Sequence, residues 1–296
     1  METEERNENA RNLHEKSTEQ ILKIINREDQ KVASAVEAVL PKIETLVAEF
    51  VKTYENGGDI CYIGAGTSGR IGVLDASEIP PTFRVPSNRI RGLIAGGKSA
   101  FASARESEED DRQAGYNRVK QEMSEGDFLI GVSASGETPF VLGGLKRAEE
   151  IGITTAAITS NENPSVEKIA ETTVVVETGP EVIAGSTRMK AGTAQKMILN
   201  MISTTAMVNL GKVYDNFMVD VVPTNKKLKR RAIRALQSLT DKDEEEIQSV
   251  LQQSGYEVKP ALISLKFGIP VSDAREALSK NDGFLGPAME EFDDKG

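Results

Sequence analysis

The sequence predicts an α/β fold, a doubly wound and mainly parallel five-stranded sheet flanked by helices, with a small helical region at the C-terminal end. Five short apolar runs, at residues 59–64, 90–96, 127–134, 154–160 and 172–178, alternate with stretches of helical periodicity. This alternation is typical of βαβ units, whose parallel sheets are covered by helices. After residue 226 the patterns are helical, which predicts the C-terminal region.

These elements predict four segments. Residues 1–55 form a helical segment that packs on the core, opened by a cap at Ser17 and broken near Pro41. Residues 56–219 form the ligand-binding α/β domain, which ends in a long, largely buried helix. Residues 220–240 form a basic connecting helix, and residues 241–296 form a region of three short helices that each close near a glycine.

Charge and composition exclude several classes of partner. The 296 residues carry a formal net charge of −10, which argues against nucleic acid or an anionic membrane as the main partner. No apolar run has spanning length, and the polar start lacks a signal-peptide core. A single cysteine excludes an internal disulfide and fits a reducing compartment. We therefore expect a cytoplasmic protein that binds a small molecule.

Two single residues limit the chemistry. His14 is the only histidine, so a multi-histidine metal site is impossible, and we expect His14 to be an ordinary surface residue. Acid–base work must then use carboxylates, lysines or tyrosines. Cys61 lies in a predicted strand, and we expect a small core residue there rather than a nucleophile.

The loop after the first predicted strand is rich in glycine. Gly64, Gly66 and Gly69 fit the pattern G-x-G-x-x-G, which also occurs in dinucleotide-binding folds. The nicotinamide version places an acidic residue after the next strand, where this sequence has none; an arginine there would still suit a phosphorylated ribose. Thr67 and Ser68 favour another use, in which Gly66, Thr67 and Ser68 hold a phosphate at a helix N-terminus.

The loop after the third predicted strand repeats this arrangement with Ser133, Ser135 and Thr138 before a proline-started helix. Simple helix capping explains either loop alone equally well. Because parallel strands end at the same edge of a sheet, we expect both loops to bind one phosphate. The absence of a G-x-x-x-x-G-K-[ST] loop argues against a nucleoside triphosphate.

A third loop precedes the long helix predicted from residue 187. Ser186 is a candidate cap, and Arg188 and Lys190 place positive charge at the start of that helix. Cations oppose the helix dipole at this end, and a bound anion would remove the conflict. The alternative, a basic turn whose cations pair with Glu177 or Glu181, is about as well supported as a bound anion.

Several motifs resemble one family. GAGTSGRIGVLDASEIPPTF, GLIAGG with ESEEDD behind it, and GPEVIAGSTRMKAGTAQKMILNMIST closely resemble the N-acetylmuramic acid 6-phosphate etherases. The similarity runs from about residue 3 to residue 285. The last of these motifs is also similar to the glucokinase regulatory protein, so it indicates the superfamily more than the chemistry.

The resemblance implies a sugar isomerase (SIS) domain that binds a phosphosugar. It implies cleavage of the ether between carbon 3 of the sugar and D-lactate, with no metal or organic cofactor, in a homodimer. The catalytic glutamates of the family fall on Glu78, as proton donor, and on Glu109. The expected phosphosugar-binding residues are those of the three loops, namely Gly66, Thr67, Ser68, Ser133, Ser135, Thr138, Ser186 and Lys190.

The sequence departs from the family pattern at three places. Ile79 stands where the family usually has cysteine, Arg84 where it has glycine, and Glu137 where it commonly has arginine. None of these removes a catalytic carboxylate. Two alternatives stay open: a non-catalytic regulator similar to the glucokinase regulatory protein, and an aldose–ketose isomerase.

The spacing of Ser68 and Glu78 raises a geometric problem. A helix that starts near Ser68 places Glu78 roughly 15 Å farther along its axis, whereas the reacting carbons lie about one sugar ring from the phosphate. Either this helix breaks early, or Glu78 reaches into the pocket of a neighbouring subunit. We expect a homodimer with a shared site.

Overall fold

The computed structural model describes residues 2–101, 106–221 and 226–293. The chain divides into two compact units, Met1–Glu78 with Pro86–Thr204, and Ile79–Val85 with Thr205–Gly296. Each unit has a hydrophobic core of its own.

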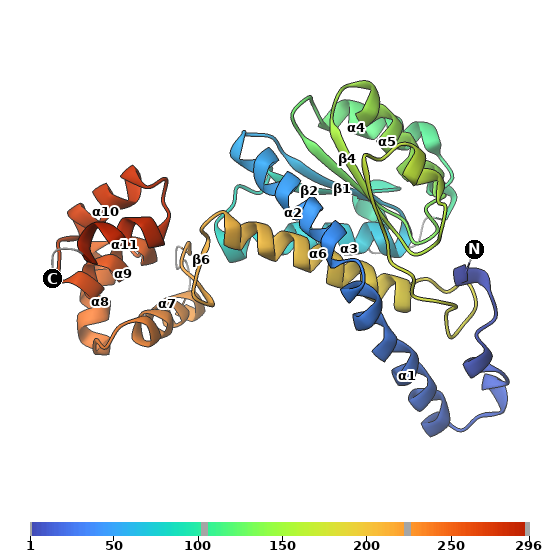
Figure 1. The fold of residues 1–296 in the computed structure, drawn as a ribbon, viewed down its shortest axis with the longest axis horizontal. Helices are drawn as coiled ribbons and strands as arrows, with labels where there is room; N and C mark the ends of the chain where they lie inside the picture. The colour runs from blue at the N-terminus through green and yellow to red at the C-terminus, as the bar shows by residue number, and fades with distance from the viewer. Residues whose placement is uncertain (1, 102–105, 222–225, 294–296) are drawn as a thin grey trace. The chain divides into compact units, whose positions relative to one another are not determined.

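The first unit contains the predicted parallel sheet (Figure 1). Its strands are β1 (Ile60–Gly64), β2 (Ile90–Ile94), β3 (Phe128–Val132), β4 (Thr154–Thr159) and β5 (Thr172–Val175). They pair in the order β2-β1-β3-β4-β5, all parallel. All five strands fall in the apolar runs of the sequence, so the predicted fold class is confirmed.

The same unit contains the helices α1 (Thr18–Glu37), α2 (Leu40–Glu55), α3 (Gly66–Phe83), α4 (Arg112–Glu122), α5 (Pro139–Glu150) and α6 (Lys190–Asn209). Of these, α2 and α5 contact the strands, and α1 extends away from the sheet (Figure 1). Three short 3-10 turns precede α1 in the described residues, namely η1 (Glu2–Glu4), η2 (Glu8–Ala10) and η3 (Leu13–Glu15). Others follow the strands, namely η4 (Gly97–Phe101) and η5 (Glu106–Glu108) after β2 and η6 (Ser165–Lys168) after β4. The α1 helix opens with the predicted capping box, in which Ser17 accepts from Gln20 N and the Gln20 side chain accepts from Ser17 N.

Alternate residues of β1 face opposite layers. Cys61 and Ile63 pack with Val119 of α4 and Leu145 of α5 in one apolar cluster. Tyr62 points the other way, and its hydroxyl donates to Asp75 Oδ2 of α3 at 3.0 Å. This alternation is the two-residue period of a strand covered on both faces.

Asp75 of α3 links this helix to α6. Its Oδ1 atom accepts from Asn200 Nδ2 at 2.6 Å and from Ser203 Oγ at 3.1 Å. Burial raises the pKa of Asp75, although these hydrogen bonds oppose the shift. The network holds α3, which follows the glycine-rich loop, against α6, which follows the third loop.

The strand order creates a switch point at β1. The chain runs from β1 through α3 to β2 on one side, whereas β3 lies on the other side of β1. The loops after β1 and β3 therefore diverge at neighbouring carboxyl ends, which is where open α/β sheets bind ligands.

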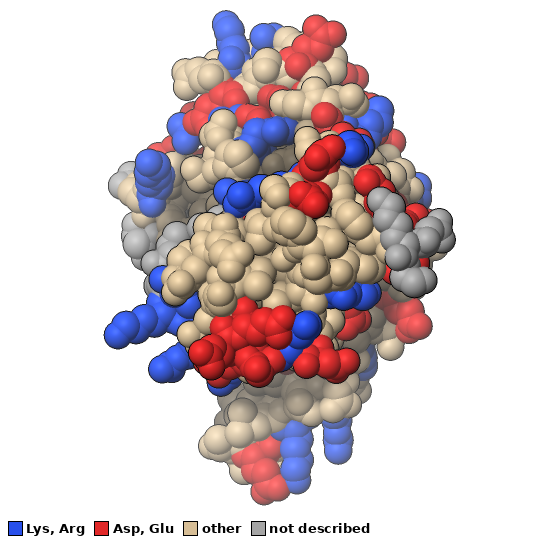
Figure 2. Space-filling view, turned by 90° about the vertical axis from the view of Figure 1, so that its left-hand side faces the viewer, with Lys and Arg blue, Asp and Glu red and all other residues tan. Residues whose placement is uncertain are grey.

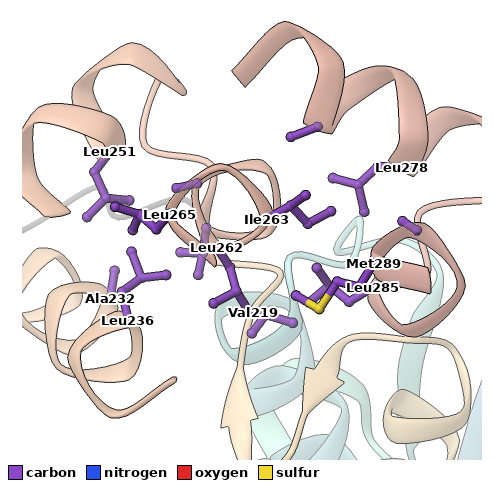
Figure 3. Packing of buried hydrophobic residues seen from close by; sticks show 14 of the residues in the cluster. Val219, Ala232, Leu236, Leu251, Leu262, Ile263, Leu265, Leu278, Leu285 and Met289 are labelled. Atoms are coloured by element: carbon purple, nitrogen blue, oxygen red, sulfur yellow. The ribbon is translucent and has the colours of Figure 1, made fainter. Parts of the chain in front are cut away.

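In its described residues the second unit contains a short hairpin and five helices, besides the last residues of α3 and α6. The hairpin pairs β6 (Val213–Tyr214) with β7 (Phe217–Met218). The helices are α7 (Lys226–Leu239), α8 (Glu244–Gln253), α9 (Val258–Phe267), α10 (Val271–Lys280) and α11 (Leu285–Asp293). Figure 3 shows their buried side chains gathered around α9.

Two elements of this unit were not predicted from the sequence. The prediction of three short helices covers α8, α9 and α10 but omits α11, because Gly286 and Pro287 in its first turn resemble a turn signal. Proline is tolerated there since its missing N–H has no helical acceptor. The strands of the β6–β7 hairpin are only two residues long, too short for a periodic pattern.

The surface carries both signs of charge. Figure 2 shows a face on which acidic side chains gather in one group while basic side chains are scattered around it. Across residues 2–101, 106–221 and 226–293, no helix combines the length and apolar character that a bilayer span requires.

Candidate active site

The glycine-rich loop turns directly from β1 into α3. A Cβ atom on Gly64 would lie 2.7 Å from Gly69 N, and one on Gly69 would lie 2.6 Å from Gly64 O. Both positions therefore require glycine for the tight turn. The first N–H groups of α3, at Gly66 to Ser68, have no acceptor within the helix, as at any helix start.

Glu109 is placed beside this turn. The residue lies between η5 and α4, and its backbone oxygen accepts from Phe140 N at 3.1 Å. A Cβ atom on Gly66 would lie 2.7 Å from Glu109 Oε1, so the missing side chain of Gly66 makes room for the carboxylate. The loop thus brings Glu109 to the N-terminus of α3.

The serine-rich loop after β3 is held by its own hydroxyls. Ser133 Oγ lies 2.8 Å from Thr138 Oγ1 and 3.3 Å from Ser135 Oγ, and it accepts from Gly136 N at 3.0 Å. Ser133 is buried, whereas Ser135 and Thr138 line a cavity. Ser133 therefore stabilises the loop from its buried side, and Ser135 and Thr138 lie at the cavity.

The third loop approaches the same place. A Cβ atom on Gly192 of α6 would lie 3.5 Å from Thr67 Cγ2, so the starts of α3 and α6 are neighbours. Ser186, Thr187 and Arg188 line the cavity. Arg188 has no ion-pair partner within the described part of the chain.

Lys190 differs from the other predicted binding residues. Its side chain is buried, and its Nζ atom donates to Glu28 Oε2 at 2.9 Å. The carboxylate of Glu181 caps α6 by accepting from Lys190 N and Ala191 N, each at 3.0 Å. The conflict between cation and helix dipole is thus relieved by Glu181 and Glu28, so a bound anion is not needed for it.

These loops enclose a cavity of about 480 Å³, a size that suits a small ligand. Its charged lining residues are Glu4, Arg70, Glu109 and Arg188. The remaining lining residues are Ala65, Gly66, Thr67, Ser68, Ala95, Ala100, Ala134, Ser135, Thr138, Ser186 and Thr187. The structure therefore brings together all the predicted site residues except Glu78, Ser133 and Lys190.

Family models match the region that builds this cavity. Residues 42–149 match the glucokinase regulatory protein N-terminal SIS domain, and residues 111–205 match the SIS domain. Among solved structures, a phosphoheptose isomerase from Francisella tularensis is 18% identical, with a TM-score of 0.49, and the match covers 65% of this chain and 99% of that one.

Curated relatives match almost the whole chain. N-acetylmuramic acid 6-phosphate etherase of Clostridium botulinum (strain Loch Maree / Type A3) is 47% identical over 291 residues, 98% of this chain and 96% of the relative. The etherase of Bacillus subtilis (strain 168) is 46% identical over the same share of both chains. This chain belongs to the N-acetylmuramic acid 6-phosphate etherase family. The family predicted from the motifs is confirmed.

Glu78, the expected proton donor, is not among the residues that line the cavity. The α3 helix runs without interruption from Gly66 to Phe83 and includes Pro80 and Pro81 near its end. Glu78 is exposed, ten positions beyond Ser68, which is about 15 Å along the axis. An early helix break, one of the two expected solutions, is absent from this described helix.

Two departures from the etherase pattern have a structural account. Glu137 is exposed, and its Oε1 atom accepts from Ser165 N at 2.7 Å, away from the cavity lining. Arg84 adopts φ 54°, a left-handed conformation in which glycine, the usual residue of the family, carries no Cβ penalty.

Cys61 and His14 have the environments that the sequence predicts. Burial raises the pKa of the Cys61 thiol to about 12, so a thiolate nucleophile is excluded there. His14 is exposed, with Nε2 3.4 Å from Glu15 Oε1. Neither residue lines the cavity.

Proposed function

We propose that this chain cleaves the D-lactyl ether of N-acetylmuramic acid 6-phosphate, giving N-acetylglucosamine 6-phosphate and D-lactate. The observation that carries the proposal is the cavity in which Glu109 lies beside the hydroxyl-rich loops, in a chain of the etherase family. A carboxylate next to a phosphate-binding loop is the arrangement that acid–base chemistry on a phosphosugar needs.

The phosphate is bound by the two loops at the switch point. The free N–H groups at the start of α3, together with the Ser68 hydroxyl, supply donors to its oxygens. Ser135 and Thr138 supply hydroxyls from the other loop, and Arg188 adds a positive charge to the same cavity. Lys190 contributes indirectly, because its buried pair with Glu28 holds the start of α6 in place.

The reaction proceeds by elimination and then addition of water. In the open-chain aldehyde, a base removes the proton from carbon 2, the bond between carbon 3 and the ether oxygen breaks, and its electron pair leaves with the lactate oxygen. That oxygen takes a proton from an acid, and a carbon 2–carbon 3 double bond remains. Water then adds its oxygen to carbon 3 as a proton returns to carbon 2, so the net change is hydrolysis without oxidation or reduction.

Glu109 is the base at carbon 2, and Glu78 protonates the departing oxygen and then activates the water. The reverse assignment of the two roles is the alternative. Two carboxylates suffice for this sequence when their environments separate their pKa values.

The active site is shared between two copies of the chain in a homodimer. The uninterrupted α3 helix and the exposure of Glu78 support this arrangement, since Glu78 does not line the cavity of its own chain. A cytoplasmic location is part of the proposal, since a single cysteine without a disulfide fits a reducing compartment.

Release of D-lactate tests this function. The purified protein should liberate D-lactate and N-acetylglucosamine 6-phosphate from N-acetylmuramic acid 6-phosphate, and Glu109→Gln should lower kcat by at least about a hundredfold. Binding of the phosphosugar without any lactate release would instead favour the regulator. Conversion between aldose and ketose phosphates would favour the isomerase.

A further inference from the structure

We propose that Glu4 is a substrate-binding residue that accepts hydrogen bonds from sugar hydroxyls in the cavity. The proposal rests on the proposed function. Glu4 is one of only two carboxylates among the residues that line the cavity in the described part of the chain, the other being Glu109. It comes from the N-terminal segment, far in sequence from the three ligand loops.

The backbone at Glu4 is fixed by its neighbour. Thr3 is almost fully buried, and its N and Oγ1 atoms each donate to Asn161 Oδ1 at 3.3 Å. Asn161 Nδ2 in turn donates to Ala134 O at 2.9 Å, within the serine-rich loop. The N-terminal segment is therefore tied through buried groups to a loop that lines the cavity, and Glu4 follows directly.

A second anchor ties this segment to the third loop. Gly185 N donates to Thr3 O at 3.0 Å. A Cβ atom on Gly185 would lie 2.6 Å from Glu4 Oε2, so the carboxylate rests on the turn just before Ser186. Glu4 is thus an exposed side chain on a buried, hydrogen-bonded support, which fixes where its charge lies.

The charges of the substrate limit what Glu4 can face. N-acetylmuramic acid 6-phosphate carries two anionic groups, the phosphate and the lactyl carboxylate, and both repel a carboxylate at short range. The neutral donors are the free sugar hydroxyls and the acetamido N–H. A carboxylate is an acceptor only, and hydrogen bonds to charged groups are the stronger kind. Glu4 therefore selects a hydroxyl-bearing sugar rather than a simple phosphate.

The test compares Glu4→Gln and Glu4→Ala with the same two changes at Glu5. Glu5 is the matched control, because it is exposed in the same segment but does not line the cavity. For the Glu4 variants we expect KM for N-acetylmuramic acid 6-phosphate to rise about tenfold with kcat within about twofold, the pattern of lost uniform binding. The Glu5 variants should match the wild type.

Two inhibitors locate the contact. The inhibition constant of N-acetylglucosamine 6-phosphate should rise about tenfold in Glu4→Gln, whereas that of inorganic phosphate should stay the same or fall, because a negative charge is removed. Equal weakening of both inhibitors, or an unchanged KM, would overturn the proposal. A loss of kcat of a hundredfold or more with KM unchanged would also overturn it, because Glu4 would then act in the chemical step.

The role of Glu4 in binding can be tested even if the protein does not cleave the ether. Thermal stabilisation by N-acetylglucosamine 6-phosphate and by inorganic phosphate measures binding without turnover. Selective loss of the sugar phosphate effect in Glu4→Gln would support the contact even if no lactate were released. An unchanged melting temperature without ligand shows that each variant is folded, and equal ligand shifts in wild type and Glu4→Gln would contradict the contact.

Discussion

A Cβ atom on Gly66 would lie 2.7 Å from Oε1 of Glu109, so the smallest side chain of the glycine-rich loop is what admits the carboxylate to the cavity. Gly66 also adopts φ 50°, which disfavours any other residue. Gly66→Ala should displace Glu109 and lower kcat by about a hundredfold, measured as D-lactate release.

Gly152→Ala is the control for backbone strain. Gly152 has φ 71° but open space around its Cβ position, so this change should lower stability by about 1 kcal/mol and leave kcat unaltered. Equal kcat values for Gly66→Ala and the wild type would contradict the placement of Glu109.

The buried pair of Glu28 and Lys190 predicts a pH-dependent stability. Burial alone opposes the charged form of Glu28, but hydrogen bonds from Lys31, Lys190, Asn7 and Asn9 outweigh it and lower the pKa of Glu28 to about 2. A lowered carboxyl pKa contributes stability above its ordinary value near 4.5, and this contribution is lost as the pH falls toward 2. Glu28→Gln should cost about 3 kcal/mol at pH 7, because Lys190 is left buried without its partner.

Urea unfolding between pH 7 and pH 3 measures this effect. The stability difference between the wild type and Glu28→Gln should narrow as the pH falls. Glu19→Gln, which removes an exposed partner of Lys23 on the same helix, should show no measurable change. A difference independent of pH would argue against the ion pair.

The fold was predictable to a greater extent than the contacts within the site. Apolar runs such as residues 127–134 identify β3 because a buried parallel strand is apolar throughout. The pairing of Glu28 with Lys190 joins residues 162 positions apart, which no local pattern records. For the same reason the sequence assigned Lys190 to the ligand and gave no role to Glu4.

The two hydroxyl-rich loops predict that serine substitutions weaken binding of the substrate phosphate. Ser68→Ala and Ser135→Ala should each raise KM about tenfold, and inorganic phosphate should compete with the substrate. Ser249→Ala, on the exposed surface of α8, serves as the matched control. A double variant of Ser68 and Ser135 with a normal KM would refute the shared phosphate site.

Mixed subunits test whether Glu78 acts across an interface. Glu78→Ala should be inactive alone, and the double variant Ser68→Ala, Ser135→Ala should show little activity at substrate concentrations near the wild-type KM. If the site is shared, a heterodimer of the two has one pocket with both lesions and one intact pocket, so about half the wild-type activity per heterodimer should return. Heterodimers that form but stay inactive would show that each pocket is built within one chain.

Cleavage in heavy-oxygen water shows directly whether the reaction proceeds by elimination followed by water addition. The label should enter the sugar at carbon 3 and be absent from the hydroxyl of D-lactate, read by carbon isotope shifts because the aldehyde oxygen at carbon 1 exchanges with water on its own. Elimination and water addition also place deuterium at carbon 2 when the water is deuterated. Label in the lactate hydroxyl, with none at carbon 3, would contradict this mechanism.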